Sequence, residues 1–326
     1  MGRGAAGAQS DDLSAVDGLG GGLAGASLRL VAPAAFHIRG APRPRTKSRG
    51  FDRPRRWILL GVTLLGPRMF GTSGIRGPVG ETVTADLALS VGRALGVDTE
   101  RVVVGRDPRE SGELLTDALT AGLRESGTDV LDLGLAATPT VARAVAWEDA
   151  DAGVSITASH NPPQDNGIKL WQASGQAFDA DRRETISQRV REDAADLRDW
   201  DDLGDRRDAD ARERHVRALV EAVEVDDPPS VIVDVGNGAG GVTVDALQEL
   251  GCTVETLNAQ PDGSFPGRPS EPTAENCESL ATLVAETDAD LGIAHDGDAD
   301  RMRAVAGDGT YLSGDVTLAL FARAAA

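Results

Sequence analysis

Short apolar segments alternate with helical segments along two stretches of the chain, and this alternation constrains the fold more than any other feature. The expected strands are 102–104, 130–133, 153–157, 231–235, 253–257 and 290–294, and the expected helices are 111–126, 140–147, 240–250 and 276–286. Strands that alternate with helices form βαβ crossovers, which place the strands in parallel and cover both faces of the sheet. The sequence therefore predicts an α/β fold of two consecutive domains with mostly parallel, mixed sheets, plus the start of a third.

Composition and the positions of prolines suggest where the domains begin and end. A charged, helix-rich stretch over 179–225 ends at Pro228 and Pro229, which mark a break before the second alternating stretch. The expected units are a basic low-complexity extension at 1–68, a first domain at 69–208, a second at 209–306 and the beginning of a third at 307–326. This last piece is too short to bury a core by itself, so we expect a third domain that the chain does not contain.

Charge is distributed unevenly along the 326 residues, which include 33 basic and 52 acidic side chains. Residues 1–68 contain 11 basic and 4 acidic residues, whereas residues 69–326 contain 22 and 48. Such an acidic body would repel the phosphates of a nucleic acid, so we expect no nucleic-acid partner. It is also typical of a halophilic protein, because salt screens the repulsion between like charges.

The basic extension shows no sustained helical or strand period, so we assign it no fold. Either it is disordered, or the natural chain starts at Met69. Its apolar segment at 57–65 is too short to span a bilayer, which needs about 20 residues, so we expect no membrane association. The two cysteines, Cys252 and Cys277, form no paired framework, which favours free thiols and a cytoplasmic protein.

A serine follows one of the expected strands, in the segment Thr157-Ala-Ser-His-Asn-Pro-Pro163. The carboxyl end of a parallel strand is the place where ligands usually bind. Ser159 beside His160 could suggest a hydrolase, but adjacent residues rarely present their side chains to each other, and no Gly-x-Ser-x-Gly elbow surrounds the serine. We therefore expect Ser159 to carry a phosphoryl group next to a cation.

Three aspartates follow another expected strand at a spacing of two: Asp296, Asp298 and Asp300. This spacing points their carboxylates the same way along an extended segment. Three carboxylate oxygens suit Mg²⁺, which keeps open positions for phosphate or water. Arg301, the next residue, is well placed to hold a phosphate oxygen.

Two further segments carry groups suited to a phosphate. The glycine-rich stretch at 70–77 resembles an anion cradle, with hydroxyls on Thr72 and Ser73 and a guanidinium on Arg76. Lys169 is the only lysine after Lys47, although 22 basic residues follow position 68. Its retention indicates a role that arginine cannot fill, such as donating and accepting a proton.

One motif supports a different interpretation. Gly236-Asn-Gly-Ala-Gly-Gly241 contains the Gly-x-Gly-x-x-Gly dinucleotide fingerprint between an expected strand and helix, and Glu255 lies near the position of a ribose-binding carboxylate. A Rossmann-like transferase or oxidoreductase with a nucleotide cofactor is thus an alternative. A non-catalytic fragment that binds metal or phosphosugar is a third.

Together, the serine, aspartate, lysine and glycine-rich motifs resemble the α-D-phosphohexomutase superfamily of phosphoglucomutases, phosphomannomutases and phosphoglucosamine mutases, over residues 69–326. The resemblance implies phosphorylation of Ser159, which with its phosphate joins the three aspartates as a metal ligand. It also implies a general acid/base role for Lys169, and it places His160 among the catalytic residues. Arg76 and Arg106 fall in segments that line the cleft.

The implied reaction is an intramolecular phosphotransfer between C6 and C1 of a hexose phosphate, through a bisphosphate intermediate. An activator of the glucose 1,6-bisphosphate type would charge the serine. In the superfamily, a third and a fourth domain supply sugar-binding and phosphate-binding loops, and neither loop occurs in this sequence. We therefore expect an isomerase whose activity is impaired by truncation, with a separately encoded C-terminal half as one source of the missing loops.

Overall fold

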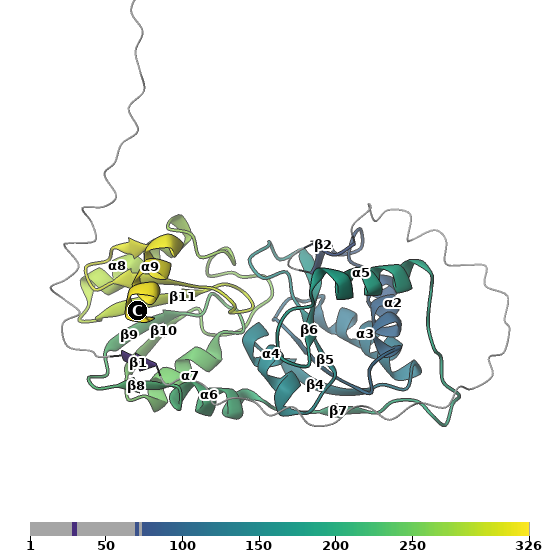
Figure 1. The fold of residues 1–326 in the computed structure, drawn as a ribbon. Helices are drawn as coiled ribbons and strands as arrows, with labels where there is room; N and C mark the ends of the chain where they lie inside the picture. Colours follow the sequence, from purple (N-terminus) through teal and green to yellow (C-terminus); the bar gives the residue numbers. More distant parts are fainter. Residues whose placement is uncertain (1–27, 31–68, 72–73, 326) are drawn as a thin grey trace, which may run out of the picture.

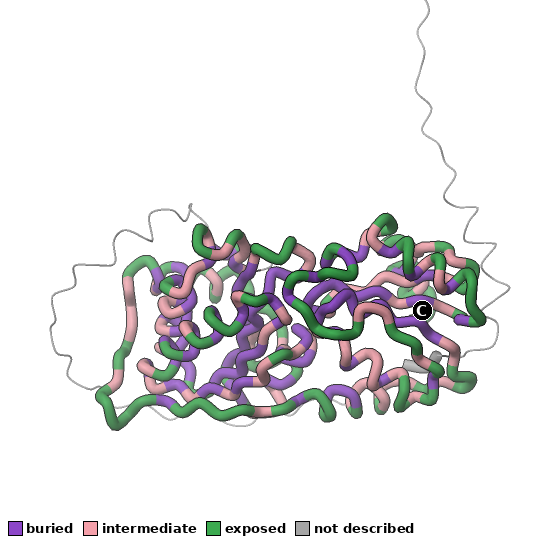
Figure 2. The backbone as a smooth tube through the Cα atoms, turned by 180° about the vertical axis from the view of Figure 1, so that it is seen from behind, coloured by how far each residue is buried: buried purple, intermediate pink, exposed green. Residues whose placement is uncertain are grey.

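The computed structural model describes residues 28–30, 69–71 and 74–325, and the statements below concern these residues. Most of the predicted basic extension and the two hydroxyl residues Thr72 and Ser73 lie outside the described residues. Two α/β units, each built around its own sheet, lie side by side along the molecule (Figure 1). Figure 2 shows buried backbone in the strands of both halves and in the loops where the halves meet.

The first sheet has six strands in the order β2-β6-β5-β3-β4-β7. Their bounds are β2 (Ile75–Pro78), β3 (Arg101–Arg106), β4 (Asp129–Leu135), β5 (Ala152–Ile156), β6 (Asp165–Gln172) and β7 (Arg206–Asp208). The four strands β5, β3, β4 and β7 pair in parallel, while β6 pairs antiparallel both with β5 and with the edge strand β2. The chain passes from β3 to its neighbour β4 and then back across β3 to β5, so successive crossovers run in opposite directions. Such a reversal opens a crevice at the carboxyl ends of β3 and β5.

Four helices cover this sheet: α2 (Ala85–Gly96), α3 (Gly112–Glu125), α4 (Thr138–Trp147) and α5 (Ala180–Arg191). Helix α2 begins at the cap residue Thr84, whose hydroxyl accepts a hydrogen bond from Leu87 N at 3.1 Å. Helices α2 and α3 pack closely because a Cβ on Gly92 would collide with the carbonyl oxygen of Leu119 on the facing helix. The first core therefore depends on small residues where the helices cross and on buried leucine and valine elsewhere.

The second sheet has five strands in the order β10-β9-β11-β12-β13. Their bounds are β9 (Ser230–Asp234), β10 (Thr253–Leu257), β11 (Leu291–His295), β12 (Met302–Ala306) and β13 (Tyr311–Leu312). The helices of this half are α6 (Arg212–Val220), α7 (Gly241–Glu249), α8 (Glu278–Glu286) after a 3₁₀ turn at Glu275–Cys277, and α9 (Gly314–Ala325). A separate two-stranded sheet joins β1 (Leu28–Leu30) to β8 (Val223–Val225).

The predicted α/β class and its two alternating stretches are confirmed. The sequence reasoning missed the helix α2 and the strands β1, β2, β6, β7, β8 and β12, and β6 is the most important because it carries Lys169. The assignment of 307–326 to a third domain stays a prediction, although β13 pairs with β12 and so extends the second sheet. Cys252 and Cys277 are free and buried. No helix in the described ranges has the length and apolar character needed to cross a bilayer.

Candidate active site

The segment that follows β5 holds Ser159 in an unusual backbone conformation. Ser159 has a φ of 56°, in the left-handed region that residues other than glycine seldom adopt, and it is fully buried. Its amide donates to Thr157 Oγ1 at 2.8 Å, and the Thr157 hydroxyl donates to Asp107 Oδ2 at 2.7 Å. This chain of hydrogen bonds runs from the end of β3 to the serine, so the loop is anchored in the crevice predicted by the topology.

Arg109 lies beneath the serine loop and is buried. Its Nε donates to Asp107 Oδ2 at 3.0 Å. Its two terminal nitrogens donate to four backbone carbonyl oxygens, at 3.0 Å to Ser159, 2.6 Å to Asn161, 2.5 Å to Pro162 and 2.8 Å to Asp165. Burial raises the pKa of Asp107, and the positive charge of Arg109 opposes that rise. One guanidinium thus organises the backbone of the whole loop.

The aspartate loop follows β11 in the second half and contacts the serine loop directly. Ser159 Oγ donates to Asp296 Oδ2 at 2.6 Å. Asp298 Oδ2 accepts from Thr138 Oγ1 at 2.6 Å, and the amide of Thr138 donates to the Asp298 carbonyl at 2.9 Å. Because Ser159 and Thr138 belong to the first half, the two predicted motifs meet in one site between the halves.

Lys169 lies on β6 with its side chain buried in the same site. Its Nζ donates to Asp298 Oδ2 and to Asp300 Oδ2, both at 2.6 Å. This single ammonium therefore contacts two of the three aspartates but offsets only one of their negative charges.

The pKa values of Asp296 and Asp298 shift in opposite directions because the two carboxylates have different neighbours. Burial, helped by the negative charges of Asp298 and Asp300, raises the pKa of Asp296 to about 7. Burial also acts to raise the pKa of Asp298. The positive charge and the hydrogen bond of Lys169, together with the hydrogen bond of Thr138, outweigh burial and leave the pKa of Asp298 below its ordinary value. A second positive charge at this site would relieve the repulsion that Asp296 experiences.

The three aspartates fit a hard divalent cation. They each offer an oxygen, and these oxygens lie within 4.8 Å of one another. Asp298 Oδ1 is buried and lacks a hydrogen-bond partner among the described residues, so it is an orphaned acceptor facing no donor. Carboxylate oxygens are the ligands that Mg²⁺ prefers. The structure therefore contains the acidic triad that the sequence predicted.

A pocket of about 200 Å³ opens beside this cluster. Its charged lining includes Arg76, Lys169, Asp300 and Arg301, and aromatic side chains of Phe70, Trp171 and Phe178 form part of the remainder. Arg76 Nε is buried without a hydrogen-bond partner in the described part of the chain, and burial lowers the pKa of this guanidinium. A partly buried guanidinium with an unsatisfied nitrogen, beside a lysine and another arginine, indicates a site for an anion.

Comparisons with known proteins agree with this geometry. One family model, described as phosphoglucomutase/phosphomannomutase, alpha/beta/alpha domain I, matches residues 67–196, and the corresponding model for domain II matches residues 213–309. The first range contains the serine loop and Lys169, and the second contains the three aspartates. The chain belongs to the phosphoglucomutase/phosphomannomutase family.

Relatives within this superfamily are substantially similar to the chain. A protein of Methanothermobacter thermautotrophicus named "Probable phosphoglucosamine mutase" is 48% identical over 262 residues, which cover 79% of this chain and 58% of the relative. A protein of the same name from Methanococcoides burtonii is 46% identical over 258 residues, covering 78% of this chain and 59% of that one.

A crystal structure of a phosphoglucomutase/phosphomannomutase family protein from Burkholderia thailandensis superposes with a TM-score of 0.71 at 34% identity, over 78% of this chain and 58% of that chain. The chain therefore spans less than two thirds of the length of these family members.

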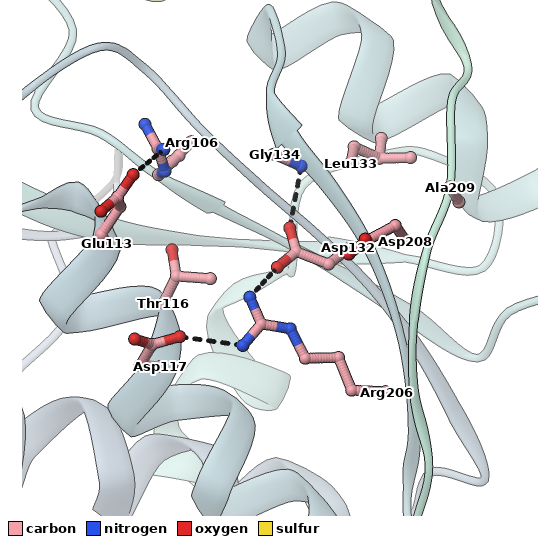
Figure 3. Close-up of a pocket in the computed structure, with 10 residues that line it drawn as sticks. All are labelled: Arg106, Glu113, Thr116, Asp117, Asp132, Leu133, Gly134, Arg206, Asp208 and Ala209. Carbon is pink, nitrogen blue, oxygen red and sulfur yellow. Dashed lines mark hydrogen bonds and ion pairs between the residues drawn. The ribbon is translucent and has the colours of Figure 1, made fainter.

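In this chain, two of the predicted site residues, His160 and Arg106, have weaker contacts with the serine or none. His160 Nδ1 lies 3.4 Å from Ser159 Oγ, at the outer limit of a hydrogen bond, and burial together with the charge of Arg301 lowers its pKa. Arg106 lies away from the serine, on a pocket of about 380 Å³. Figure 3 shows its guanidinium directed at Glu113, to which it donates at 2.7 Å. Phosphate binding by Arg106 thus stays a prediction.

The glycine-rich segment after β9 has a structural explanation that removes its main support for a nucleotide cofactor. A Cβ on Gly236 would lie 2.6 Å from an Arg268 guanidinium nitrogen, and one on Gly238 would lie 2.6 Å from the carbonyl oxygen of Gly297. Both glycines therefore serve close packing within the chain. Gly238 allows the aspartate loop to pack closely against the segment before α7, so the glycine-rich run has a role in the packing of this half that needs no nucleotide cofactor.

Four residues that the sequence reasoning did not single out belong to the site: Arg109, Asp107, Thr138 and Ser270. The signal that the sequence offers is the charged pair in Asp107-Pro-Arg109, which follows an expected strand in the same segment as Arg106. A charged pair directly after a buried strand often has a structural partner, because an isolated buried charge is costly.

Proposed function

We propose that this chain carries the phosphoserine and metal half of a phosphohexomutase active site, which transfers a phosphoryl group between Ser159 and an oxygen of a hexose phosphate. The observation that carries the proposal is the 2.6 Å hydrogen bond from Ser159 Oγ to Asp296 Oδ2, since it joins the two family motifs across the halves. The names of the curated relatives support glucosamine phosphate as the first hexose phosphate to test.

Ser159, Asp296 and Lys169 have different roles in the proposed transfer. The hydrogen bond to Asp296 orients the Ser159 hydroxyl toward the aspartate loop. When Ser159 takes a phosphoryl group from a sugar bisphosphate, the bond from phosphorus to the sugar oxygen breaks and the bond to Oγ forms, and the proton leaves Oγ for Asp296 Oδ2, which accepts its hydrogen bond. The departing sugar oxygen needs a proton, and Lys169, held as an ammonium between two carboxylates, is the donor that lines the pocket.

The anion-binding role falls to Arg76 and Arg301, which line the same pocket. Asp296, Asp298 and Asp300, with the phosphate on Ser159, would hold Mg²⁺. When bound, this ion supplies positive charge that stabilises the charge on the transferring phosphoryl group. A sugar bisphosphate of the glucose 1,6-bisphosphate type is the activator that would first charge the serine.

The whole mutase reaction is a further proposal, because the chain spans less than two thirds of its relatives. Repeated turnover requires groups that bind the sugar hydroxyls and the phosphate that is not transferred. We expect these from a C-terminal partner, and we expect the chain alone to react slowly. The cytoplasmic location, deduced from cysteine usage, stays a prediction as well.

A single-turnover experiment tests the proposal. Protein in high salt with Mg²⁺ is mixed with an equal amount of glucose 1,6-bisphosphate, and the glucose monophosphate released is measured. The proposal predicts about one monophosphate per protein and none from Ser159→Ala. Equal release from both proteins would exclude Ser159 as the acceptor, and no release from the wild type would favour a fragment that only binds metal or phosphosugar.

A further inference from the structure

The carbonyl oxygen of Ser159 is held from both halves of the molecule. It accepts from Arg109 Nη2 at 3.0 Å and from Ser270 Oγ at 2.8 Å. We propose that Arg109 and Ser270 are positioning residues that clamp this carbonyl, maintain the left-handed backbone of Ser159 and thereby set the rate of phosphoryl exchange. The predicted effect on the rate of phosphoryl exchange rests on the proposed function, whereas the clamp itself rests on the structure alone.

Arg109 is itself fixed by the second half. The ring of Phe265 lies 5.0 Å from the Arg109 guanidinium carbon, in a cation–π arrangement. Close by, a Cβ on Gly263 would collide with the carbonyl oxygen of Pro108. The segment around Gly263 and Phe265 therefore seats against the residues that organise the serine loop. Any separation of the halves would remove one side of this support.

Ser270 links the serine loop to the aspartate loop through one hydroxyl. While its Oγ donates to the Ser159 carbonyl, it accepts from the amide of Gly297 at 3.0 Å. A Cβ on Gly297 would lie 2.8 Å from Ser270 Oγ and 2.9 Å from the Ser159 oxygen, so the three groups are closely packed. Because Gly297 separates Asp296 from Asp298, this bridge fixes the distance between the serine and the aspartates.

The clamp matters because the conformation it holds is unfavourable by itself. A residue other than glycine persists in the left-handed region only when its surroundings determine it. Loss of the Ser270 hydroxyl would leave the Ser159 carbonyl with Arg109 alone and would free the Gly297 amide. Small displacements of reacting groups can reduce a rate by 100-fold, so the loop can remain folded and still react slowly.

The test compares Ser270→Ala with Ser264→Ala. Ser264 is a matched control because it lies in the same segment and is exposed, and its hydroxyl donates to Asp262. Hydrogen exchange of the backbone amides at 157–169 is measured without substrate. The charging rate is then measured over a range of glucose 1,6-bisphosphate concentrations. Ser270→Cys, which keeps the shape of the side chain but donates weakly, replaces Ser270→Ala if the alanine variant does not fold.

We expect exchange at 157–169 to be at least about 5-fold faster in Ser270→Ala than in the control, because a hydrogen bond to the loop is lost. The maximal charging rate should fall about 10- to 100-fold, with little change in the half-saturating bisphosphate concentration or in Mg²⁺ affinity. Ser270→Thr, which keeps the hydroxyl, should restore both readouts. Equal exchange in Ser270→Ala and Ser264→Ala would overturn the clamp. Failure of the wild type to be charged would overturn the proposed function instead, and the exchange data would still decide the clamp.

Discussion

Replacement of Lys169 by Met should destabilise the protein in a way that Mg²⁺ partly reverses. The Lys169 ammonium contacts Asp298 and Asp300 at 2.6 Å each, and removal of one partner from a buried ion pair costs roughly 3 to 5 kcal/mol. Because the Asp300 side chain is 29% exposed, we take the lower end, about 3 kcal/mol. For a body of this size, each kcal/mol lowers the Tm by about 2 to 4 °C, so the expected loss is about 6 to 12 °C.

Differential scanning calorimetry at constant ionic strength, with and without Mg²⁺, measures the effect. A bound cation would replace the missing positive charge, so Mg²⁺ should raise the Tm of Lys169→Met more than that of the wild type. Arg207→Met is the control, since the exposed pair of Arg207 with Asp205 should be worth less than about 1 kcal/mol. An equal Mg²⁺-induced rise in the wild type and Lys169→Met would refute the argument that the lysine and the metal share these carboxylates.

Further predictions concern metal affinity, pH, packing and salt. Asp298→Asn should weaken Mg²⁺ binding at least about 10-fold by titration calorimetry, because a ligand charge is lost; unchanged affinity would place the ion elsewhere. Burial lowers the pKa of His215 to about 4 from 6.5, so the unfolded chain binds more protons between these values. The contribution of His215 to the free energy of unfolding is therefore fully present above pH 6.5, and it falls by up to about 3 kcal/mol toward pH 4. His215→Gln should flatten this pH dependence in denaturant titrations. An unchanged slope would exclude His215 as its source. Gly92→Ala should cost about 1 to 3 kcal/mol in urea unfolding because its methyl group would overlap α3, and a neutral effect would contradict the close helix packing. Transfer from molar salt to dilute buffer should lower the Tm, whereas no change would argue against halophilic adaptation.

The fold was predictable wherever an apolar segment and a helix had ordinary lengths. Strand β10 has the predicted bounds, Thr253–Leu257, and α3 is one residue shorter than predicted at each end. Strand β6 was missed because it contains Asn166 and Gly167, which are unfavourable in strands, and because it is stabilised by pairing with β5 and β2. That pairing involves residues far apart in the sequence, which no local pattern reveals.

The site was predictable to the extent that its chemistry resides in side chains. The spacing of the three aspartates and the exceptional lysine pointed to groups that the structure brings together. Arg109 was missed because its partners are backbone carbonyl oxygens about 50 residues away, and carbonyl oxygens have no signature in a sequence. Arg106 lies in the same segment, and only the structure shows that it points toward Glu113 instead.

The most direct test of the account is the phosphorylation state of Ser159. Peptide mass spectrometry of protein purified in high salt with Mg²⁺ would be applied to the peptide covering 157–169, before and after addition of glucose 1,6-bisphosphate and then of glucosamine 6-phosphate. The account predicts one phosphoryl group on Ser159 that the bisphosphate adds and the hexose phosphate removes. A peptide that stays unphosphorylated throughout, or a phosphate on another residue of the loop, would contradict it.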